Sequence, residues 1–148
     1  MKDAIRGIEC QLEDSAINGL LFFLAKEPCE FFVPWYSAIY NNGMILPNDT
    51  KNFVVDSDDI AVMMNHTIWE MVLHLYPPGA QIAQIETYED FVKSSCICCL
   101  IYYDCGFLDI YVKDPLLLER IREQLISLNA TDMVTIRDSN DGRTHLTT

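Results

Sequence analysis

The stretch that decides the fold is residues 96–128, which read CICCLIYYDCGFLDIYVKDPLLLERIREQLISL. Its first half holds two apolar segments, 96–103 and 107–112, that are rich in aromatic and aliphatic residues. Cys105 and Gly106 lie between them, and a glycine between two such segments is typical of a hairpin turn. The sequence therefore predicts a compact β-hairpin here.

A helix-start signal follows the hairpin directly. Asp114 can accept a hydrogen bond from a free N–H group of the first turn, and Pro115 suits the first helical position because it lacks an N–H. Apolar residues then recur at helical spacing: Leu118, Ile121, Leu125 and Leu128. With Asn129 placed to end it, this segment predicts a helix with one apolar face.

The two faces of the hairpin differ in character if Cys105 and Gly106 form a two-residue loop, which places Tyr102 opposite Asp109. One face is then wholly apolar and belongs to the core: Ile97, Cys99, Ile101, Tyr103, Leu108, Ile110 and Val112. The other face mixes aromatic and acidic residues: Cys98, Leu100, Tyr102, Asp104, Phe107, Asp109, Tyr111 and Lys113. Such a mixture is typical of a recognition surface, and a covering layer of structure is the alternative.

The other elements lie on either side of this stretch. Strands are predicted at residues 4–12, 31–40, 69–76 and 133–137. Helices are predicted at residues 17–24, 61–65 and 88–93, with a turn at 41–43. Pro34 favours an edge position or a bulge, Pro28 stops the first helix, and Thr87 with Asp90 resembles a capping box. We expect an α+β fold, one domain over 1–148, with a mostly antiparallel twisted sheet and two longer helices mainly on one face.

The charge of the chain narrows its partners. Twenty-two acidic residues stand against ten Lys and Arg, which gives a formal net charge of −12. Such a field repels phosphate backbones and anionic lipids, so we expect no nucleic-acid and no membrane partner. A basic protein, a cation or a neutral ligand remains open, and solubility alone also accounts for the charge. No secretory signal and no membrane-length apolar run is present, so we expect a cytoplasmic protein whose six cysteines are thiols.

The cysteines and acids offer weak chemical motifs. Cys96 and Cys99 have CxxC spacing, but residues three apart on a strand point to opposite faces, so neither a metal nor another cofactor is expected. Asp104 with Asp109 could form an acid–base pair, and His74 could act as a base, although solvated and structural roles are more common. No phosphate loop, nucleophile elbow or HExxH occurs, so no catalytic residue is assigned.

Three short motifs carry a resemblance to a known family: Glu86-Thr87-Tyr88-Glu89-Asp90-Phe91, Asp109-Ile110-Tyr111-Val112-Lys113-Asp114 and Ser139-Asn140-Asp141-Gly142-Arg143-Thr144. Over residues 80–146 the chain resembles the bacterial domain of unknown function 2691, and the first half is similar only in length and pattern. The resemblance implies a small single-domain bacterial protein and assigns no catalytic residue, cofactor or partner.

Charge and motifs together favour a non-enzymatic protein-binding module, of the inhibitor or immunity kind, that binds a basic partner protein. The expected binding residues are Tyr102, Asp104, Phe107, Asp109, Tyr111 and Arg143. Arg143 is expected either to form a salt bridge with the acidic surface or to contact an anion or a carboxylate at the end of the sheet. The alternative is a small enzyme or small-molecule-binding protein with a polar site at the sheet end, which requires a pocket that brings together at least two of Asp104, Asp109, His74 and Arg143. A homodimer through the hairpin face or an edge strand is compatible with either.

Overall fold

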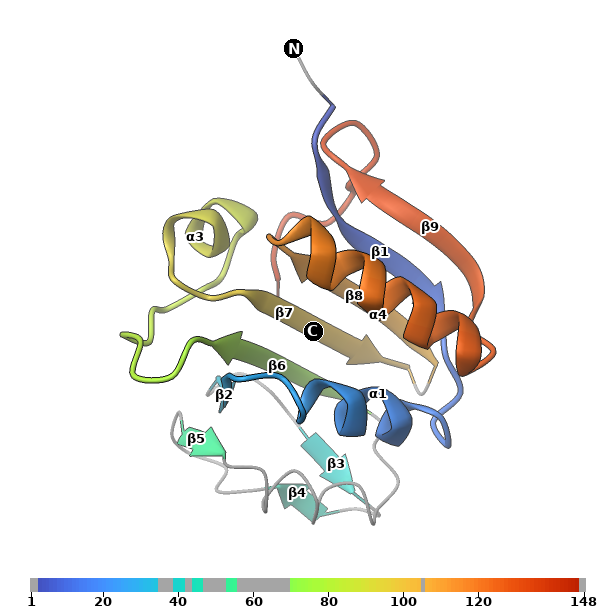
Figure 1. Ribbon diagram of the computed structural model, residues 1–148, viewed down its shortest axis with the longest axis horizontal. Coiled ribbons are helices and arrows are strands. Elements are labelled where there is room, and N and C mark those ends of the chain that lie inside the picture. The colour runs from blue at the N-terminus through green and yellow to red at the C-terminus, as the bar shows by residue number, and fades with distance from the viewer. Residues whose placement is uncertain are drawn as a thin grey trace.

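The computed structural model describes residues 3–34, 39–41, 44–46, 53–55, 70–104 and 106–146 of the chain. Its strands are β1 (Ile5–Gln11), β2 (Glu30–Val33), β3 (Ile39–Asn41), β4 (Met44–Leu46), β5 (Phe53–Val55), β6 (Met71–Tyr76), β7 (Cys98–Tyr103), β8 (Phe107–Val112) and β9 (Thr131–Arg137). Its helices are α1 (Ile17–Leu24), α3 (Tyr88–Lys93) and α4 (Pro115–Ser127). Seven strands form one sheet in the order β5-β2-β6-β7-β8-β1-β9, and β3 pairs with β4 separately (Figure 1).

Every neighbouring pair in the large sheet is antiparallel. Strands β8 and β9 both pair with β1, so they run parallel to each other, and α4 connects them across the sheet. This is the strand–helix–strand arrangement that residues 107–137 predicted. The expected α+β fold with a mostly antiparallel sheet is confirmed.

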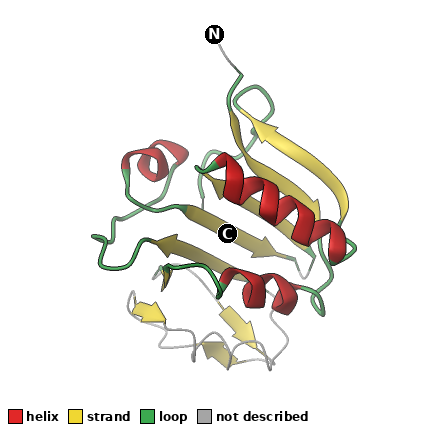
Figure 2. Cartoon of the chain, in the orientation of Figure 1, coloured by secondary structure: helices red, strands yellow, loops and turns green. Residues whose placement is uncertain are grey.

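Apolar side chains cover both faces of the central strands. Helices α1 and α4 lie together over one face, and Figure 2 shows both in front of the strands. Their buried residues, such as Leu20 and Ile121, join Leu100 and Ile110 of the hairpin in one apolar cluster. A second cluster on the opposite face contains Phe91 of α3 among its members. The central sheet is therefore a middle layer, with the two longer helices on one face as expected.

The helix caps follow the sequence closely, except in α1. The Asp114 side chain accepts a hydrogen bond from the Leu116 N–H at 3.1 Å, and Pro115 opens α4. Thr87 and Asp90 form the full capping box of α3. The sequence Glu13-Asp14-Ser15 precedes helix α1 and offers a cap, yet the cap position is taken by Ala16, with no side-chain hydrogen bond.

Strand boundaries differ from expectation around the prolines. The predicted strand at 31–40 is observed as β2, which stops at Val33, just before Pro34. Strand β2 lies between β5 and β6, so of the two alternatives that Pro34 favoured, an edge position or a bulge, the edge position is wrong; Pro34 instead follows the end of the strand. Asn41 pairs with Met44, while the predicted turn residues 42–43 and the predicted helix at 61–65 lie outside the described residues.

The register of the β7–β8 hairpin is one residue away from the predicted one. Tyr103, not Asp104, pairs with Phe107, and Ile101 pairs with Asp109, so the loop has three residues. Asp104 takes a left-handed conformation with φ of 51°, which a loop of this length accommodates. The shift turns Tyr102 toward α1 and α4 while Asp109 remains on the other face, and the predicted assignment of the two faces is wrong.

The outer edge of β9 ends the sheet, and a side chain blocks part of it. Asn140 accepts a hydrogen bond from the Arg137 N–H at 2.7 Å and donates one to the Thr135 carbonyl at 3.0 Å. An amide side chain thus takes the place that a further strand would occupy. Asp132 also has a left-handed backbone, with φ of 52°, next to a register shift against β1. Both features are typical of edges protected against strand addition.

No helix in the described part of the chain is long and apolar enough to cross a membrane.

Candidate functional site

An open pocket of about 530 Å³ lies at the hairpin on the face opposite α1 and α4. It is lined by Glu9, Tyr103, Asp109, Tyr111, Asp141, Gly142, Arg143, Thr144 and His145. Three parts of the chain supply these residues: β1, the β7–β8 hairpin, and the C-terminal segment (residues 138–146). The antiparallel pairing of β1 with β8 and the path of the C-terminal segment over the sheet bring them together.

An ion pair between Asp109 and Arg143 forms the centre of the pocket. Arg143 donates from Nη2 at 2.8 Å and from Nε at 3.0 Å to the same oxygen, Oδ2 of Asp109. The side chains are 8% (Asp109) and 20% (Arg143) exposed. Burial opposes the charge on Arg143, but its hydrogen bond to Asp109 and the Asp109 charge outweigh this and raise the pKa of Arg143. The charge-assisted bonds fix both groups at the floor of the pocket.

An aromatic wall stands beside this ion pair. The guanidinium carbon of Arg143 lies 5.2 Å from the centre of the Tyr103 ring. Tyr103 stacks on Phe107 with a centroid distance of 5.6 Å and an interplanar angle of 21°. The Tyr103 hydroxyl also donates to Oδ2 of Asp109 at 3.5 Å. Phe107 is 42% exposed, so the wall reaches the rim of the pocket.

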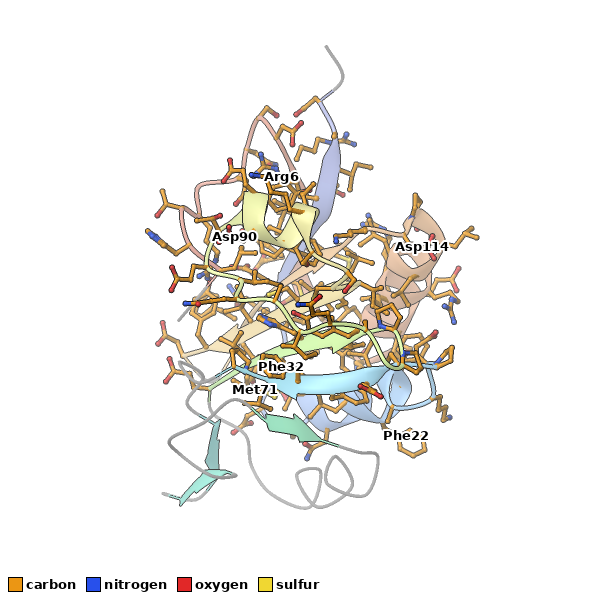
Figure 3. The ribbon with its side chains drawn as sticks, turned by 90° about the vertical axis from the view of Figure 1, so that its left-hand side faces the viewer. Arg6, Phe22, Phe32, Met71, Asp90 and Asp114 are labelled. Carbon is orange, nitrogen blue, oxygen red and sulfur yellow. The ribbon has the colours of Figure 1, made fainter. Side chains whose placement is uncertain are left out.

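Asp141 holds the C-terminal segment against the sheet. It accepts hydrogen bonds from the Tyr111 hydroxyl at 3.1 Å and from Nη1 of Arg6 at 3.1 Å. Burial, followed by the charge of Asp141, raises the pKa of Tyr111, which therefore stays a donor. The guanidinium carbon of Arg6 in turn lies 4.0 Å from the centre of the Tyr88 ring. Figure 3 shows Arg6 beside the helix that carries Asp90. This network joins β1, α3 and the C-terminal segment.

Glu9 carries the unbalanced charge of the pocket. It lies directly opposite Asp109 on the neighbouring strand, so the two carboxylates share a face. Burial raises the pKa of Glu9, the charges of Asp109 and Asp141 raise it further, and Arg143 lowers it. Within the described part of the chain, Asp109 pairs with Arg143, and Arg6 is shared between Asp141 and Asp138, but no ion pair involves Glu9. The pocket therefore has more carboxylates than its cations neutralise, and Glu9 is the one outside any ion pair.

The structure separates the six expected binding residues. Asp109, Tyr111 and Arg143 line the pocket, and Phe107 lies at its rim. Asp104 is exposed in the hairpin loop. Tyr102 is on the opposite face, fully buried, and its hydroxyl donates to the Leu12 carbonyl at 3.0 Å. The one-residue register shift accounts for the exchange of Tyr102 for Tyr103.

Other lining residues had no sequence signal that pointed to a site. The alternation in β1 places Glu9 on one face, but only the observed pairing brings it opposite Asp109. Asp141 and His145 come from the turn-rich tail, whose path over the sheet no local pattern specifies. For Arg143 itself, pairing with an acid, the simpler of the two expectations, is what the structure shows.

His74 and the cysteines that the structure describes are not among the residues that line this pocket. Burial raises the pKa of Cys10 and Cys96 to about 12 and the pKa of Cys98 and Cys99 well above the ordinary value, so these groups remain thiols. Among the described residues no group of three or more His, Cys, Asp or Glu could hold a metal ion. His74 is 1% exposed on β6, opposite Cys99. Burial makes these side chains part of the core.

Comparison with known proteins gives a family but no activity. A curated relative from Bacillus subtilis (strain 168), "Uncharacterized protein YncE", is 33% identical over 75 residues. These residues cover 51% of this chain and 49% of the relative, so the similarity spans about half of each protein. No solved structure matches. The family described as "Protein of unknown function (DUF2691)" matches residues 39–147, a longer range than the 80–146 that the motifs indicated. Because this match covers more than half of the chain, the protein belongs to the DUF2691 family.

Proposed function

We propose that this protein is a non-enzymatic binding module, of the inhibitor or immunity kind, that binds a basic partner protein through the pocket beside Asp109. The observation that carries the proposal is the surplus carboxylate: Glu9 faces the pocket with no cation against it in the described residues. A cationic group of a partner would relieve the repulsion between Glu9 and Asp109. The site therefore favours a cation over an anion, although Arg143 lies within it.

The charge of the whole chain supports the same choice of partner. A formal net charge of −12 on 148 residues attracts basic proteins over distance and raises their rate of encounter. The long-range field brings a basic partner to the surface without selecting a position on it. The pocket supplies a position, because its ion pair and aromatic wall are already held in place by neighbouring residues.

The rim of the pocket has the composition of a binding surface. Phe107 is 42% exposed and packs against Tyr103, and exposed Asp104 lies between them in the loop. Aromatic residues with acidic neighbours can bury apolar area while charge complementarity selects the partner. The proposal keeps the predicted aromatic and acidic surface, with Tyr103 at the position predicted for Tyr102.

The test is to capture binding partners from the protein's own cells with the tagged protein. It compares the unmodified chain with variants whose charges are reversed at the pocket or away from it. Asp109→Lys is unsuitable because it would place a lysine against Arg143 at 8% exposure. Glu9→Lys with Asp104→Lys changes the pocket and its rim without breaking that pair. Glu13→Lys with Glu123→Lys is the matched control, since both glutamates are exposed and lie outside the pocket lining.

We expect the unmodified chain and the control variant to capture a basic protein in stoichiometric amount, and high salt to release it. The variant with Glu9→Lys and Asp104→Lys should not capture this protein. Equal loss in both variants would mean that net charge alone retains the protein, which contradicts a site at the pocket. Recovery of the unmodified chain alone would contradict the proposal as a whole.

A second candidate is a small-molecule-binding or catalytic site in the same pocket. Asp109 and Arg143 meet there in a concave space, and small-ligand pockets span roughly 300–1,000 Å³. Asp104 and His74 do not line it, so an acid–base pair would have to use Asp109 with another group. A thermal-shift screen of small metabolites separates the candidates: a hit that Glu9→Gln abolishes favours this second function.

A further inference from the structure

We propose that the group bound between Glu9 and Asp109 is an alkylguanidinium, the functional group of an arginine side chain. This inference rests on the proposed function and narrows it, because a basic partner could equally present lysine. Three features of the pocket carry the choice: the unused oxygen of Asp109, the spacing of the two carboxylates, and the aromatic wall.

The Asp109 carboxylate uses only one of its two oxygens. Nε and Nη2 of Arg143 and the Tyr103 hydroxyl all donate to Oδ2. No described residue donates a hydrogen bond to Oδ1. The side chain is 8% exposed and lines the pocket, so a ligand can reach this oxygen while water has limited access. A carboxylate in such surroundings gains most from a charged donor.

Glu9 supplies a second acceptor at a suitable spacing. Side chains directly opposite on antiparallel strands have Cβ atoms about 4.5–5.5 Å apart. Carboxylates on side chains that start this close together can reach two edges of one planar, five-donor guanidinium. An ammonium is a compact point charge without this planar fork, and it is more strongly hydrated. The pair of acceptors therefore favours guanidinium.

Arg143 shows that the pocket accommodates this group. Its guanidinium already lies beside the Tyr103 ring while it donates to Asp109. A second guanidinium would donate to the other oxygen of Asp109, Oδ1, beside the same aromatic wall. Glu9 would accept hydrogen bonds from its remaining N–H groups. The alkyl stem would run along the exposed part of Phe107, which stacks on Tyr103. Guanidinium groups stack on aromatic faces more readily than ammonium groups do.

The experiment compares two small cations of equal stem length on the full-length protein. Isotope-labelled protein is titrated with n-butylguanidinium and with n-butylammonium, and the amide resonances of Glu9, Asp109 and Arg143 are followed. We expect the guanidinium to bind about tenfold more tightly, and Glu9→Gln to weaken it by about tenfold. Glu123→Gln, the same change at an exposed position of α4, should leave the affinity for guanidinium unchanged. A melting temperature for Glu9→Gln at or above that of the unmodified chain verifies that the fold is intact.

A second pair of probes identifies the source of the guanidinium. A neutral peptide with one arginine is compared with its lysine counterpart and with n-butylguanidinium. Tighter binding of the arginine peptide than of the small cation supports an arginine on a protein partner. Equal binding of the two supports a free small alkylguanidinium.

The outcomes separate this inference from the function on which it rests. Equal binding of guanidinium and ammonium, or guanidinium binding that Glu9→Gln leaves unchanged, overturns the guanidinium assignment while a captured basic partner still stands. Capture of a basic protein without binding of either small cation also overturns the assignment. Failure of both the titrations and the capture overturns both proposals.

Discussion

Removal of the Arg143 guanidinium should destabilise the fold through the charge that it leaves on Asp109. In Arg143→Met the apolar stem is retained, and the Asp109 carboxylate keeps only the Tyr103 hydroxyl, 3.5 Å away, among the donors that the structure shows on Oδ2. Because Asp109 is 8% exposed, water replaces the lost bonds poorly. Asp109→Asn should be destabilising for the complementary reason, since it leaves the guanidinium without its counter-charge.

The size of the effect follows from the burial of the pair. Breaking a fully buried pair costs about 3–5 kcal/mol, and exposed pairs contribute about 0–1 kcal/mol. With side chains 20% and 8% exposed, the pair lies between these limits, and we expect each single variant to lose about 2 kcal/mol of unfolding free energy. For a chain of this length that is a fall in melting temperature of about 4–8 °C. The double variant should lose less than the sum of the two, with a coupling of about 1.5 kcal/mol.

Urea denaturation followed by far-UV circular dichroism measures all four proteins of this cycle. The pair Arg122 and Glu119 provides the matched control, because Glu119 is 63% exposed and the two residues are neighbours on α4. Its coupling should not exceed about 0.5 kcal/mol. A coupling for Arg143 and Asp109 no larger than that of the control would refute the view that burial makes this ion pair stabilise the fold.

Further predictions concern pH, the sheet edge and a helix cap. Burial lowers the pKa of His74 to about 4. The unfolded chain takes up that proton near pH 6.5, so the unfolding free energy should fall from about pH 6.5 toward pH 4, by at most about 1.4 kcal/mol per pH unit, and His74→Gln should flatten this slope. Asn140→Ala frees the Arg137 N–H and the Thr135 carbonyl, and sedimentation should then show more self-association than in the unmodified chain. Thr87→Ala should cost about 1 kcal/mol in urea denaturation, whereas Thr87→Ser should be nearly neutral.

Local signals predicted the elements whose start depends on a few adjacent residues. Asp114 with Pro115 placed the start of α4, and Thr87 with Asp90 placed that of α3, because each cap acts on N–H groups within three residues. The first helix shows the limit of this reasoning. Asp14 and Ser15, both suitable cap residues, precede it, yet Ala16 occupies the cap position without a side-chain bond. Burial of Leu20 and its apolar neighbours against the sheet holds the helix instead.

The hairpin shows why two neighbouring residues were assigned to the wrong faces. Both Asp104 and Cys105 can serve in a turn, and loops of two or three residues fit the same letters. In the structure the loop has three residues, and the first of them, Asp104, has a left-handed backbone. Apolar residues occur on both faces of this hairpin, so the hydrophobic pattern does not correct the error. The length of the loop thus decides whether Tyr102 or Tyr103 meets the pocket.

The pocket itself lies beyond the reach of local patterns for a related reason. Glu9 and Arg143 are separated by most of the chain, and they meet only because β1 inserts between β8 and β9 while the C-terminal segment returns over the hairpin. The sequence did indicate that aromatic and acidic residues of the hairpin share a face, which is a property of the strand period. It did not indicate which charge lacks a partner. That depends on pairing across the sheet, where Glu9 stands opposite Asp109 while Arg143 is already engaged, and this single imbalance makes a cation the favoured ligand.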